Sequence, residues 1–259
     1  IEIPNKFKQI FKTASEVSQG SYPEIWAIAK TCAERLMIDV PKVFVRNAPN
    51  KMEIYSISAE NTSPVIVLTS GLCEKCTKDE LSYLIGCECG HIQNNHCIYY
   101  QAAPSFGIIM DSEVVNPVTD NGKQLASVMM DWLTLSCVTA DRAGIICLDR
   151  PQDFSSVFIS LREKGLNDIY SRTGQIFDKN KAEKMYETLH VTPARSISLD
   201  SSTNFLERRY FAGMEFLNCE TLYSWRNDIG GDDLHTVNKQ ALEVRCEIIL
   251  GSDSGKAGV

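Results

Sequence analysis

Three residues near the middle of this sequence have the types and spacing of a metal-assisted hydrolytic site. Cys87 and His91 are four positions apart, and Glu88 lies between them. On a helix, side chains at positions i and i+4 share one face, so the Cys87 sulfur and a ring nitrogen of His91 could bind one metal ion. A glutamate in the position of Glu88 can act as general base toward a metal-bound water. The pattern predicts a zinc site with hydrolytic chemistry.

The segment that carries these residues is predicted to be a long helix, Lys78–Tyr99, which Thr77 and Glu80 begin with the spacing of a capping box. Three β-type runs precede it and predict a small sheet, at Lys42–Arg46, Glu53–Ile57 and Val65–Thr69, with turns at residues 47–50 and 61–64. Amphipathic periodicity predicts further helices at Lys6–Val17, Pro23–Met37, Lys123–Asp149, Gln152–Glu163, Lys179–Leu189, Asn204–Leu217 and Leu234–Leu250.

These elements predict one α+β domain over residues 1–259, mostly helical, with its small sheet near the N-terminal third. The core of the domain is expected over residues 43–217, with N-terminal helices in residues 1–42. Residues 105–122 hold turn formers and little periodicity, so they are predicted to form a loop. Residues 251–259 are predicted to be a disordered tail.

The composition excludes several classes of protein. Of the 259 residues, 44% are hydrophobic, and 26 Lys and Arg stand against 33 Asp and Glu, which gives a formal net charge of −7. An acidic chain without a basic run is unsuited to nucleic acid, so no nucleic-acid partner is expected. The most apolar stretches are far shorter than the ~20 residues of a membrane span, which predicts a soluble protein.

Ten cysteines stand against only four histidines. A chain of this length can bury a full core without disulfides, so the thiols are predicted to be reduced and the protein to be cytoplasmic. The sequence begins at Ile1 without a methionine, which indicates processing or a cut from a longer chain. A removed signal or membrane anchor therefore stays open, and so does the oligomeric state.

The stretch from Val43 to Gly144 resembles the HtpX-like and CAAX prenyl endopeptidases, gluzincin zinc metallopeptidases of peptidase family M48. Pro64–Leu72 is similar to the strand and turn that precede the zinc helix of that family. The run Asp79–His96 reads D-E-L-S-Y-L-I-G-C-E-C-G-H-I-Q-N-N-H and is similar to the family's D-E-L-x-x-V-x-x-H-E-x-x-H-x-x-x-x-H, with Cys87 in place of the first histidine. The resemblance implies a zincin-like fold in which the sheet packs on the metal-binding helices.

A second motif completes the metal site that the resemblance implies. Cys137–Gly144 reads C-V-T-A-D-R-A-G and resembles the family's E-x-x-A-D, with a cysteine where the third zinc ligand would be a glutamate. The implied ligands of Zn²⁺ are thus Cys87, His91 and Cys137, with the fourth position open to water. Glu88 would take the proton from this water as it attacks a peptide carbonyl.

Three other positions belong to the implied site. Asp141 matches a family aspartate that supports the metal, and here it could orient His91 through the free ring nitrogen, or be a solvated charge next to Arg142. The run from Thr203 to Arg209 is similar to the family's C-terminal H-P-x-x-x-x-R. Arg209 is present and would polarise or position the substrate, whereas Thr203 stands where a transition-state-stabilising histidine would be.

The two cysteine ligands would change the metal as well as hold it. Two thiolates cancel both charges of Zn²⁺, whereas a single carboxylate cancels one, so the metal would be a weaker Lewis acid. Hydrolysis is therefore expected to be slower than in a family member with the full ligand set. The expected substrate is a peptide or protein that lies along the edge of the small sheet as an added strand.

Several alternatives stay open. The chain could be a noncatalytic pseudopeptidase that keeps a zinc ion or an empty pocket for stability or partner binding. It could also be a cysteine hydrolase in which His91 activates Cys87, although an orienting third group is missing from the pattern. Cys73 and Cys76 form a C-x-x-C that could be a redox pair, half of a zinc site or helix packing. His96 is expected to be a partly exposed helix residue and not a ligand.

Overall fold

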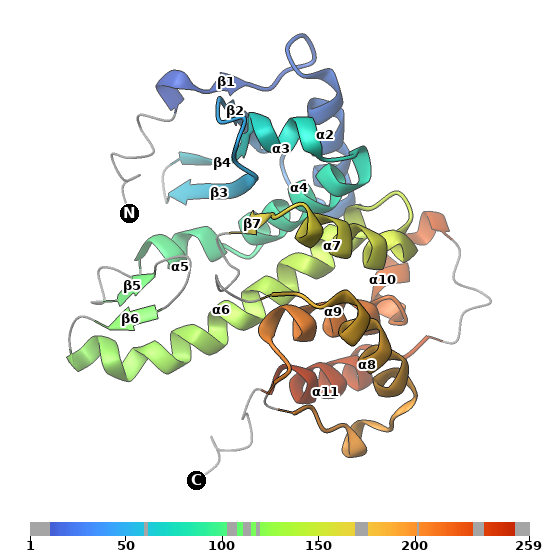
Figure 1. Cartoon of the computed structure of the whole chain (residues 1–259). Coiled ribbons are helices and arrows are strands. Elements are labelled where there is room, and N and C mark those ends of the chain that lie inside the picture. Colours follow the sequence, from blue (N-terminus) through green and yellow to red (C-terminus); the bar gives the residue numbers. More distant parts are fainter. Residues whose placement is uncertain are drawn as a thin grey trace. The chain divides into compact units, whose positions relative to one another are not determined.

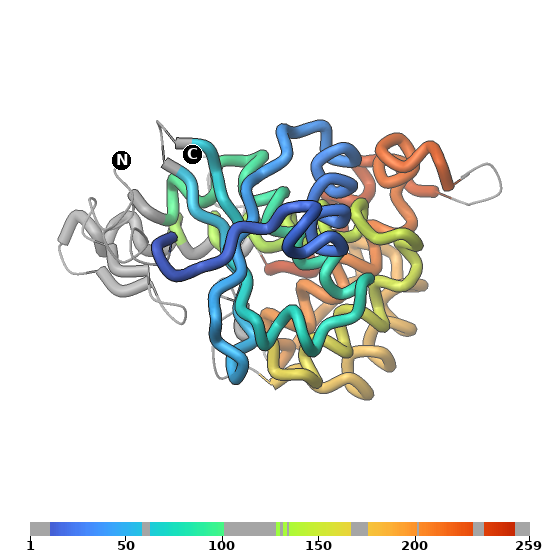
Figure 2. Tube along the Cα trace, turned by 90° about the horizontal axis from the view of Figure 1, so that it is seen from above, coloured from blue at the N-terminus to red at the C-terminus, as the bar shows by residue number. Residues whose placement is uncertain are grey.

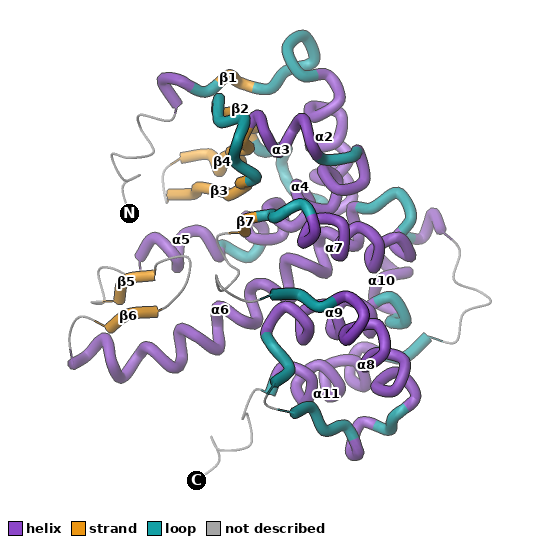
Figure 3. The backbone as a smooth tube through the Cα atoms, viewed as in Figure 1, coloured by secondary structure: helices purple, strands orange, loops and turns teal. Residues whose placement is uncertain are grey.

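The computed structural model describes residues 11–59, 62–102, 108–110, 115–117, 120–168, 176–200, 202–229 and 236–251. The chain divides into two compact units, residues 1–173 and 174–259. Most of the structure is helical, and the strands are few and short (Figure 3). Many helices with one small mixed sheet are the α+β composition that the sequence predicts. The single-domain organisation stays a prediction.

The first unit contains a five-stranded sheet with the strand order β1-β2-β4-β3-β7 (Figure 1). The strands are β1 Ser15–Glu16, β2 Lys42–Arg46, β3 Glu53–Ala59, β4 Thr62–Thr69 and β7 Asn167–Asp168. β2 and β4 are parallel, β3 is antiparallel to β4, and the three lie side by side (Figure 2). All three central strands match the predicted runs.

Two expectations about this sheet are wrong. The predicted helix Lys6–Val17 does not extend through Ser15–Glu16, because these residues pair with β2 as a short edge strand; residues 1–10 lie outside the described part. The predicted turn at residues 61–64 is wrong from residue 62 on, because Thr62 already begins β4 and pairs with Ala59; residue 61 lies outside the described part.

The helices of the first unit are α2 Pro23–Leu36, α3 Ser70–Lys75, α4 Lys78–Gln93, α5 His96–Ala102, α6 Asp120–Cys147 and α7 Phe154–Glu163, with the 3-10 turn Pro151–Asp153 before α7. The predicted loop at residues 105–122 contains two short antiparallel strands, β5 Ile108–Met110 and β6 Val115–Pro117, and the start of α6. The rest of that segment lies outside the described residues. Within the described ranges, every helix is too short or too polar to cross a membrane.

Helix α4 lies in the interior of the first unit. It packs against α6, α2 and β3, and every residue from Glu80 to His91 is buried (Figure 1). A helix that is buried on all sides cannot carry solvated charges, so each of its polar side chains needs a partner inside the protein. The partners of these polar side chains therefore define the chemistry of this region.

The predicted helix Lys78–Tyr99 is broken in two, and the prediction of one continuous helix is wrong. Asn94 ends α4, and its side-chain amide donates to the Gly90 carbonyl. Asn95 is left-handed, with φ of 57°. Asparagine tolerates this conformation better than other residues with a Cβ, so the chain reverses here and begins α5 at His96.

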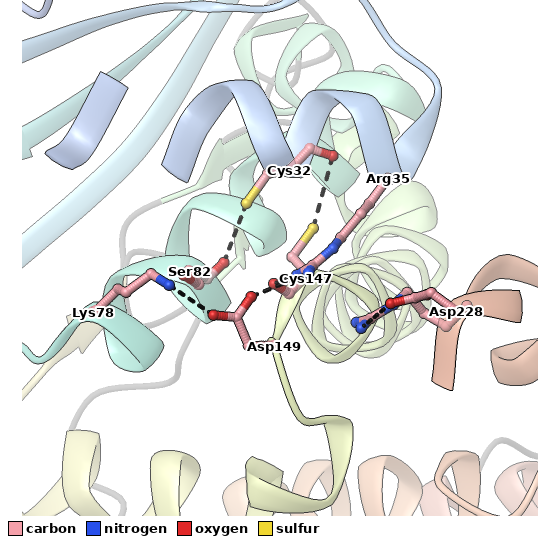
Figure 4. Close-up of polar contacts among 8 residues, drawn as sticks. Cys32, Arg35, Lys78, Ser82, Cys147, Asp149 and Asp228 are labelled. Carbon is pink, nitrogen blue, oxygen red and sulfur yellow. Dashed lines mark hydrogen bonds and ion pairs between the residues drawn. The ribbon is translucent and has the colours of Figure 1, made fainter. Parts of the chain in front are cut away.

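The ends of α2, α4 and α6 meet at a junction of thiols and charges (Figure 4). The Cys32 thiol donates to the Ser82 carbonyl at 3.5 Å, and the Cys147 thiol donates to the Cys32 carbonyl at 3.9 Å. Lys78 forms an ion pair of 2.7 Å with Asp149 beside them. All ten cysteines of the chain are free thiols, and those at this junction act as small packing groups with weak hydrogen bonds.

The second unit is helical. Its elements are α8 Lys179–Val191, α9 Phe205–Phe216, α10 Glu220–Trp225 and α11 Lys239–Leu250, with 3-10 turns at Ala194–Ser196 and Asn227–Ile229. Helix α11 begins later than predicted, because Asn238 caps it by accepting from the Ala241 amide and Val237 bridges to Cys219. The predicted tail lies outside the described residues beyond Gly251.

Candidate active site

The helix that carries the predicted site begins as the sequence indicates. The Glu80 amide donates to the Thr77 hydroxyl at 3.3 Å, and the Thr77 amide donates to the Glu80 carboxylate at 2.7 Å, which confirms the capping box. Cys87, Glu88 and His91 then follow on one continuous helix, at 9%, 3% and 2% exposure. Their common helix is therefore confirmed, and all three are removed from solvent.

Small residues allow α4 and α6 to approach closely. A Cβ atom built on Gly90 would lie 2.6 Å from the Ala143 Cβ. A Cβ atom on Gly144 would lie 2.6 Å from the Cys87 sulfur and 2.7 Å from the Tyr83 ring. The Cys87 thiol thus packs directly on the backbone of α6 at Gly144, in space that exists because Gly144 has no side chain.

Helix α6 supplies the other two predicted residues, Cys137 and Asp141. Both are buried, one helical turn apart. Asp141 accepts a hydrogen bond of 2.7 Å from the Tyr83 hydroxyl, so the alternative of a solvated charge at this position is wrong. Tyr83 belongs to α4, and its contact with Asp141 ties the two helices together beside Cys87.

The three predicted zinc ligands are not gathered at one point in this structure. Gly144, against which Cys87 packs, follows Cys137 by seven residues. That separation is about 10 Å along a helix axis, whereas two zinc-bound sulfurs are at most about 4.6 Å apart. Across the described ranges, no group of three or more His, Cys, Asp or Glu side chains is arranged to hold a metal ion. Cysteine and histidine are residue types that bind zinc, but in this structure the three side chains are not close enough together to bind one ion.

Glu88 has a partner that the sequence pattern did not reveal. The Ser56 hydroxyl on β3 donates to Glu88 Oε2 at 2.6 Å and lies 3.0 Å from the Cys97 sulfur on α5. All three residues are buried. Tyr55 and Ile57 belong to the apolar cluster on the other face of the strand, so Ser56 points toward the helices by strand alternation. The available signal was a serine on the inward face of a buried strand, between the apolar residues Tyr55 and Ile57.

His91 also has an unexpected neighbour. Its Nδ1 lies 3.0 Å from Nδ1 of His96, across the Asn94–Asn95 reversal. His96 is only 7% exposed, and its ring meets the Trp132 ring edge-on with 5.6 Å between centroids. Burial lowers the pKa of His96 to about 4. The expectation of a partly exposed His96 is therefore wrong, because the helix break folds this residue back into the core.

Thr203 and Arg209 belong to the second unit. Thr203 precedes α9, whose capping box pairs Asn204 with Glu207, and Arg209 lies within the helix over the Phe205 ring. Both are buried. Within the part of the chain that the structure describes, the Thr203 hydroxyl oxygen is buried without a hydrogen-bond partner.

The C-x-x-C motif lies at the end of α3. Cys73 and Cys76 are half-buried, and burial raises their pKa values to about 11 and about 12. Both thiols are therefore protonated at neutral pH, which disfavours a thiolate metal ligand or a reactive redox pair. Helix packing is the interpretation that this environment supports.

Comparison with known proteins places these features in a family. The model of peptidase family M48 matches residues 22–162, from the start of α2 to the end of α7. The plastoglobule-localized metallopeptidase 48 of Arabidopsis thaliana chloroplasts is 24% identical over 159 residues, which cover 58% of this chain and 43% of the relative. The protease HtpX homolog of Pediococcus pentosaceus is 32% identical over 83 residues, which cover 31% of this chain and 27% of the relative.

The matched regions cover only part of this chain and of its relatives. The chain spans less than half the length of either relative. No solved structure matches it. The family model, however, covers more than half of the chain. It includes the central strands β2, β3 and β4 and the helices α4 and α6, which carry Glu88 and the three predicted metal ligands, whereas Arg209 lies outside the match. The chain belongs to peptidase family M48.

Proposed function

We propose that this chain is a metallopeptidase-type hydrolase that cleaves peptide bonds of peptide or protein substrates. Zn²⁺ would be held by Cys87, His91 and Cys137, which are the residue types that zinc prefers. The observation that carries the proposal is the burial of Cys87, Glu88 and His91 on α4, packed against the helix that bears Cys137. Family membership supports the reaction class.

The metal would supply Lewis-acid polarisation of the substrate carbonyl when bound. For the three donors to meet at one ion, the Cys87 sulfur, which packs on Gly144, would have to move toward Cys137 by more than a side-chain rotation allows, so α4 and α6 would have to shift along each other. Glu88 would accept a proton from the attacking water, and the Ser56 hydroxyl would hold one oxygen of its carboxylate in a fixed direction. A hydroxyl donor orients a carboxylate without neutralising its charge, which suits a base.

The substrate would bind as an added strand at the edge of β3. Among the described residues, β7 pairs with this edge only at Glu53 and Ile54. Strand addition satisfies the backbone groups of an extended peptide, and alternate side chains would provide specificity. The resemblance implies that Arg209 would polarise or position the substrate.

Metal content and peptide cleavage test the proposal together. The purified chain is expected to bind about one zinc per molecule and to cleave labelled casein, and Glu88→Gln is expected to abolish cleavage while zinc stays bound. Cys87→Ala and Cys137→Ala should each lose zinc, whereas the matched control Cys73→Ser should keep it. Cleavage that survives Glu88→Gln or chelation would contradict the proposal.

One observation favours a second candidate, a noncatalytic M48 domain. Cys87 packs on Gly144, and the described residues form no three-donor metal group. Buried side chains that pack in this way can contribute to the core of the protein without binding a metal ion. Protein that is folded and zinc-free, and that leaves casein intact, would favour this candidate. Activity blocked by iodoacetamide but not by a chelator would instead favour a cysteine hydrolase based on Cys87.

A further inference from the structure

The second unit contains a polar cavity of about 360 Å³. Its walls come from the ends of α8 and α9 and from α11, and α9 packs against both other helices (Figure 1). Cavities of about 300–1,000 Å³ are of the size that holds small molecules. His190 and Thr236 line the cavity and are exposed, so a ligand can enter from solvent.

A fixed ion pair forms part of the cavity wall. The Glu215 carboxylate, which is only 5% exposed, accepts from Arg245 Nε at 2.6 Å and from Nη2 at 3.0 Å. Arg245 also donates from Nη1 to the Thr192 carbonyl at 2.7 Å and from Nη2 to the Leu189 carbonyl at 3.0 Å. The hydrogen bonds to Glu215 raise the pKa of Arg245, so the guanidinium stays charged. Both charged groups are therefore held in one position.

The groups of this wall have hydrogen-bonding capacity left for a ligand. A guanidinium has five N–H groups, and the contacts within the described part of the chain account for four of them in Arg245, which leaves one on Nη1. Each carboxylate oxygen of Glu215 can accept a further bond. The Asn218 side chain donates a long bond of 3.4 Å to the Met214 carbonyl, and its oxygen is another acceptor. The cavity therefore offers both a cationic donor and anionic and neutral acceptors.

The pairing of opposite charges selects the kind of ligand. A simple ion that is attracted by one member of the Arg245–Glu215 pair is repelled by the other member, which lies in contact with it. A molecule that carries an ammonium group and a carboxylate close together can form a charge-assisted hydrogen bond with each member. Leu217 and Val237 add an apolar part to the same wall. These features match a small zwitterion with an apolar side chain.

We propose that this cavity binds a free α-amino acid with an apolar side chain. Glu215 and the side-chain oxygen of Asn218 would accept from its ammonium group, and the remaining N–H of Arg245 would donate to its carboxylate. The apolar side chain would lie against Leu217 and Val237. All of these residues belong to the second unit, so the site does not depend on the proposed peptidase function.

Three ligands of nearly equal shape test the charge pattern. At neutral pH, L-leucine carries both charges, L-leucinamide carries the ammonium group, and 4-methylpentanoate carries the carboxylate. Calorimetric titration of the unmodified chain is expected to give an affinity for L-leucine about 10-fold or more above that for either analogue, because each analogue lacks one charged hydrogen bond. Equal affinity for the three ligands, or no binding of L-leucine at millimolar concentration, would overturn the proposal.

A substitution that changes the charge of the wall tests the placement of the ligand. Asn218→Asp adds a second carboxylate, so the preference is expected to change from L-leucine to the cationic L-leucinamide. The control Glu187→Gln, on the exposed surface of α8, is expected to leave all three affinities unchanged. A folded Asn218→Asp variant that still prefers L-leucine would overturn the placement of the ammonium group. If this variant does not fold, the comparison of the three ligands on the unmodified chain decides the proposal.

Discussion

The two halves of α4 satisfy their buried polar groups in different ways. At the first turn, Glu80 accepts from the Thr77 amide, the Ser160 hydroxyl and the Lys164 ammonium group, with an ion pair of 2.6 Å. In the second half, Glu88 accepts from the Ser56 hydroxyl and His91 pairs with His96. The first set contains the Lys164 cation, which neutralises the charge of Glu80, whereas the Ser56 hydroxyl and the His96 ring are neutral at pH 7.

This difference indicates that the two ends of α4 have different roles. A carboxylate with a cation and several donors around it is stabilised as an anion and resists protonation. A carboxylate or imidazole held by neutral partners keeps its direction and also its ability to exchange a proton or bind a ligand. The first turn of α4 therefore anchors the helix, whereas the half from Cys87 to His91 carries the residues of the proposed site.

The largest expected effect is at the anchored end. Glu80→Ala removes half of the capping box and leaves the Lys164 and Ser160 groups without their acceptor. Loss of one partner of a buried ion pair costs about 3–5 kcal/mol, so urea unfolding should give a free energy lower by about 3 kcal/mol, since Lys164 is part-exposed. The neighbouring Asp79→Asn, which keeps the capping box, serves as control. Equal losses in the two variants would refute the anchoring role.

Serine substitutions compare the two ends directly. Ser56→Ala is expected to cost about 2 kcal/mol of unfolding free energy, because a hydrogen bond to a buried carboxylate is worth about 1.5–3 kcal/mol. Ser160→Ala removes the same kind of bond from Glu80, where Lys164 and Thr77 remain as donors, and is expected to cost less. If denaturation shows Ser160→Ala to be the more harmful, the two ends do not differ as described.

The close contact of α4 and α6 predicts a smaller effect. Gly90→Ala places a methyl group 2.6 Å from the Ala143 Cβ, which costs about 1–3 kcal/mol as overpacking and is partly offset by about 1 kcal/mol of helix propensity. The net loss should be about 0–2 kcal/mol in thermal or urea unfolding. The exchange Gly90→Ala with Ala143→Gly should recover part of it. A double variant less stable than Gly90→Ala would argue against this contact.

The last test is the pH dependence of the unfolding free energy in acid. Burial by itself raises the pKa of Glu80, but hydrogen bonds from Lys164, Ser160 and the Thr77 amide outweigh it and lower the pKa below 4.5. The stabilisation is therefore present above pH 4.5 and is lost as the pH falls through the lower folded value. Unfolding free energy should fall less steeply with decreasing pH in Glu80→Gln than in the unmodified chain.

Asp149 provides the matched control for this acid test. The Lys78 side chain lowers its pKa, with a further contribution from Arg35, but the carboxylate is about half-exposed. Asp149→Asn should therefore change the decrease of the unfolding free energy at low pH less than Glu80→Gln does. Its effect should disappear in about 0.5 M NaCl, where exposed charges are screened. An effect of Asp149→Asn that equals that of Glu80→Gln and persists in salt would remove the distinction between buried and exposed anchors.

Local patterns predicted much of the fold. The capping box at Thr77 and Glu80 could be predicted from the sequence because its two hydrogen bonds join residues three positions apart. Most helices and the three central strands were likewise found from periodicity, which depends on which face of an element is buried. The break at Asn94–Asn95 was missed, because apolar periodicity continues across it and the left-handed conformation of one asparagine is a local choice that packing decides.

The candidate site shows the same division. The sequence by itself determined that Cys87, Glu88 and His91 share a helix, and that Cys137 and Asp141 lie one turn apart on another. Only the tertiary structure decided that Ser56 holds Glu88, that His96 meets His91, and that Cys87 packs on Gly144. Spacing along one helix follows from its fixed rise and rotation. Contacts between elements depend on how closely the backbones approach, and at α4 and α6 this is decided by Gly90 and Gly144, at positions where the family motifs specify no residue type.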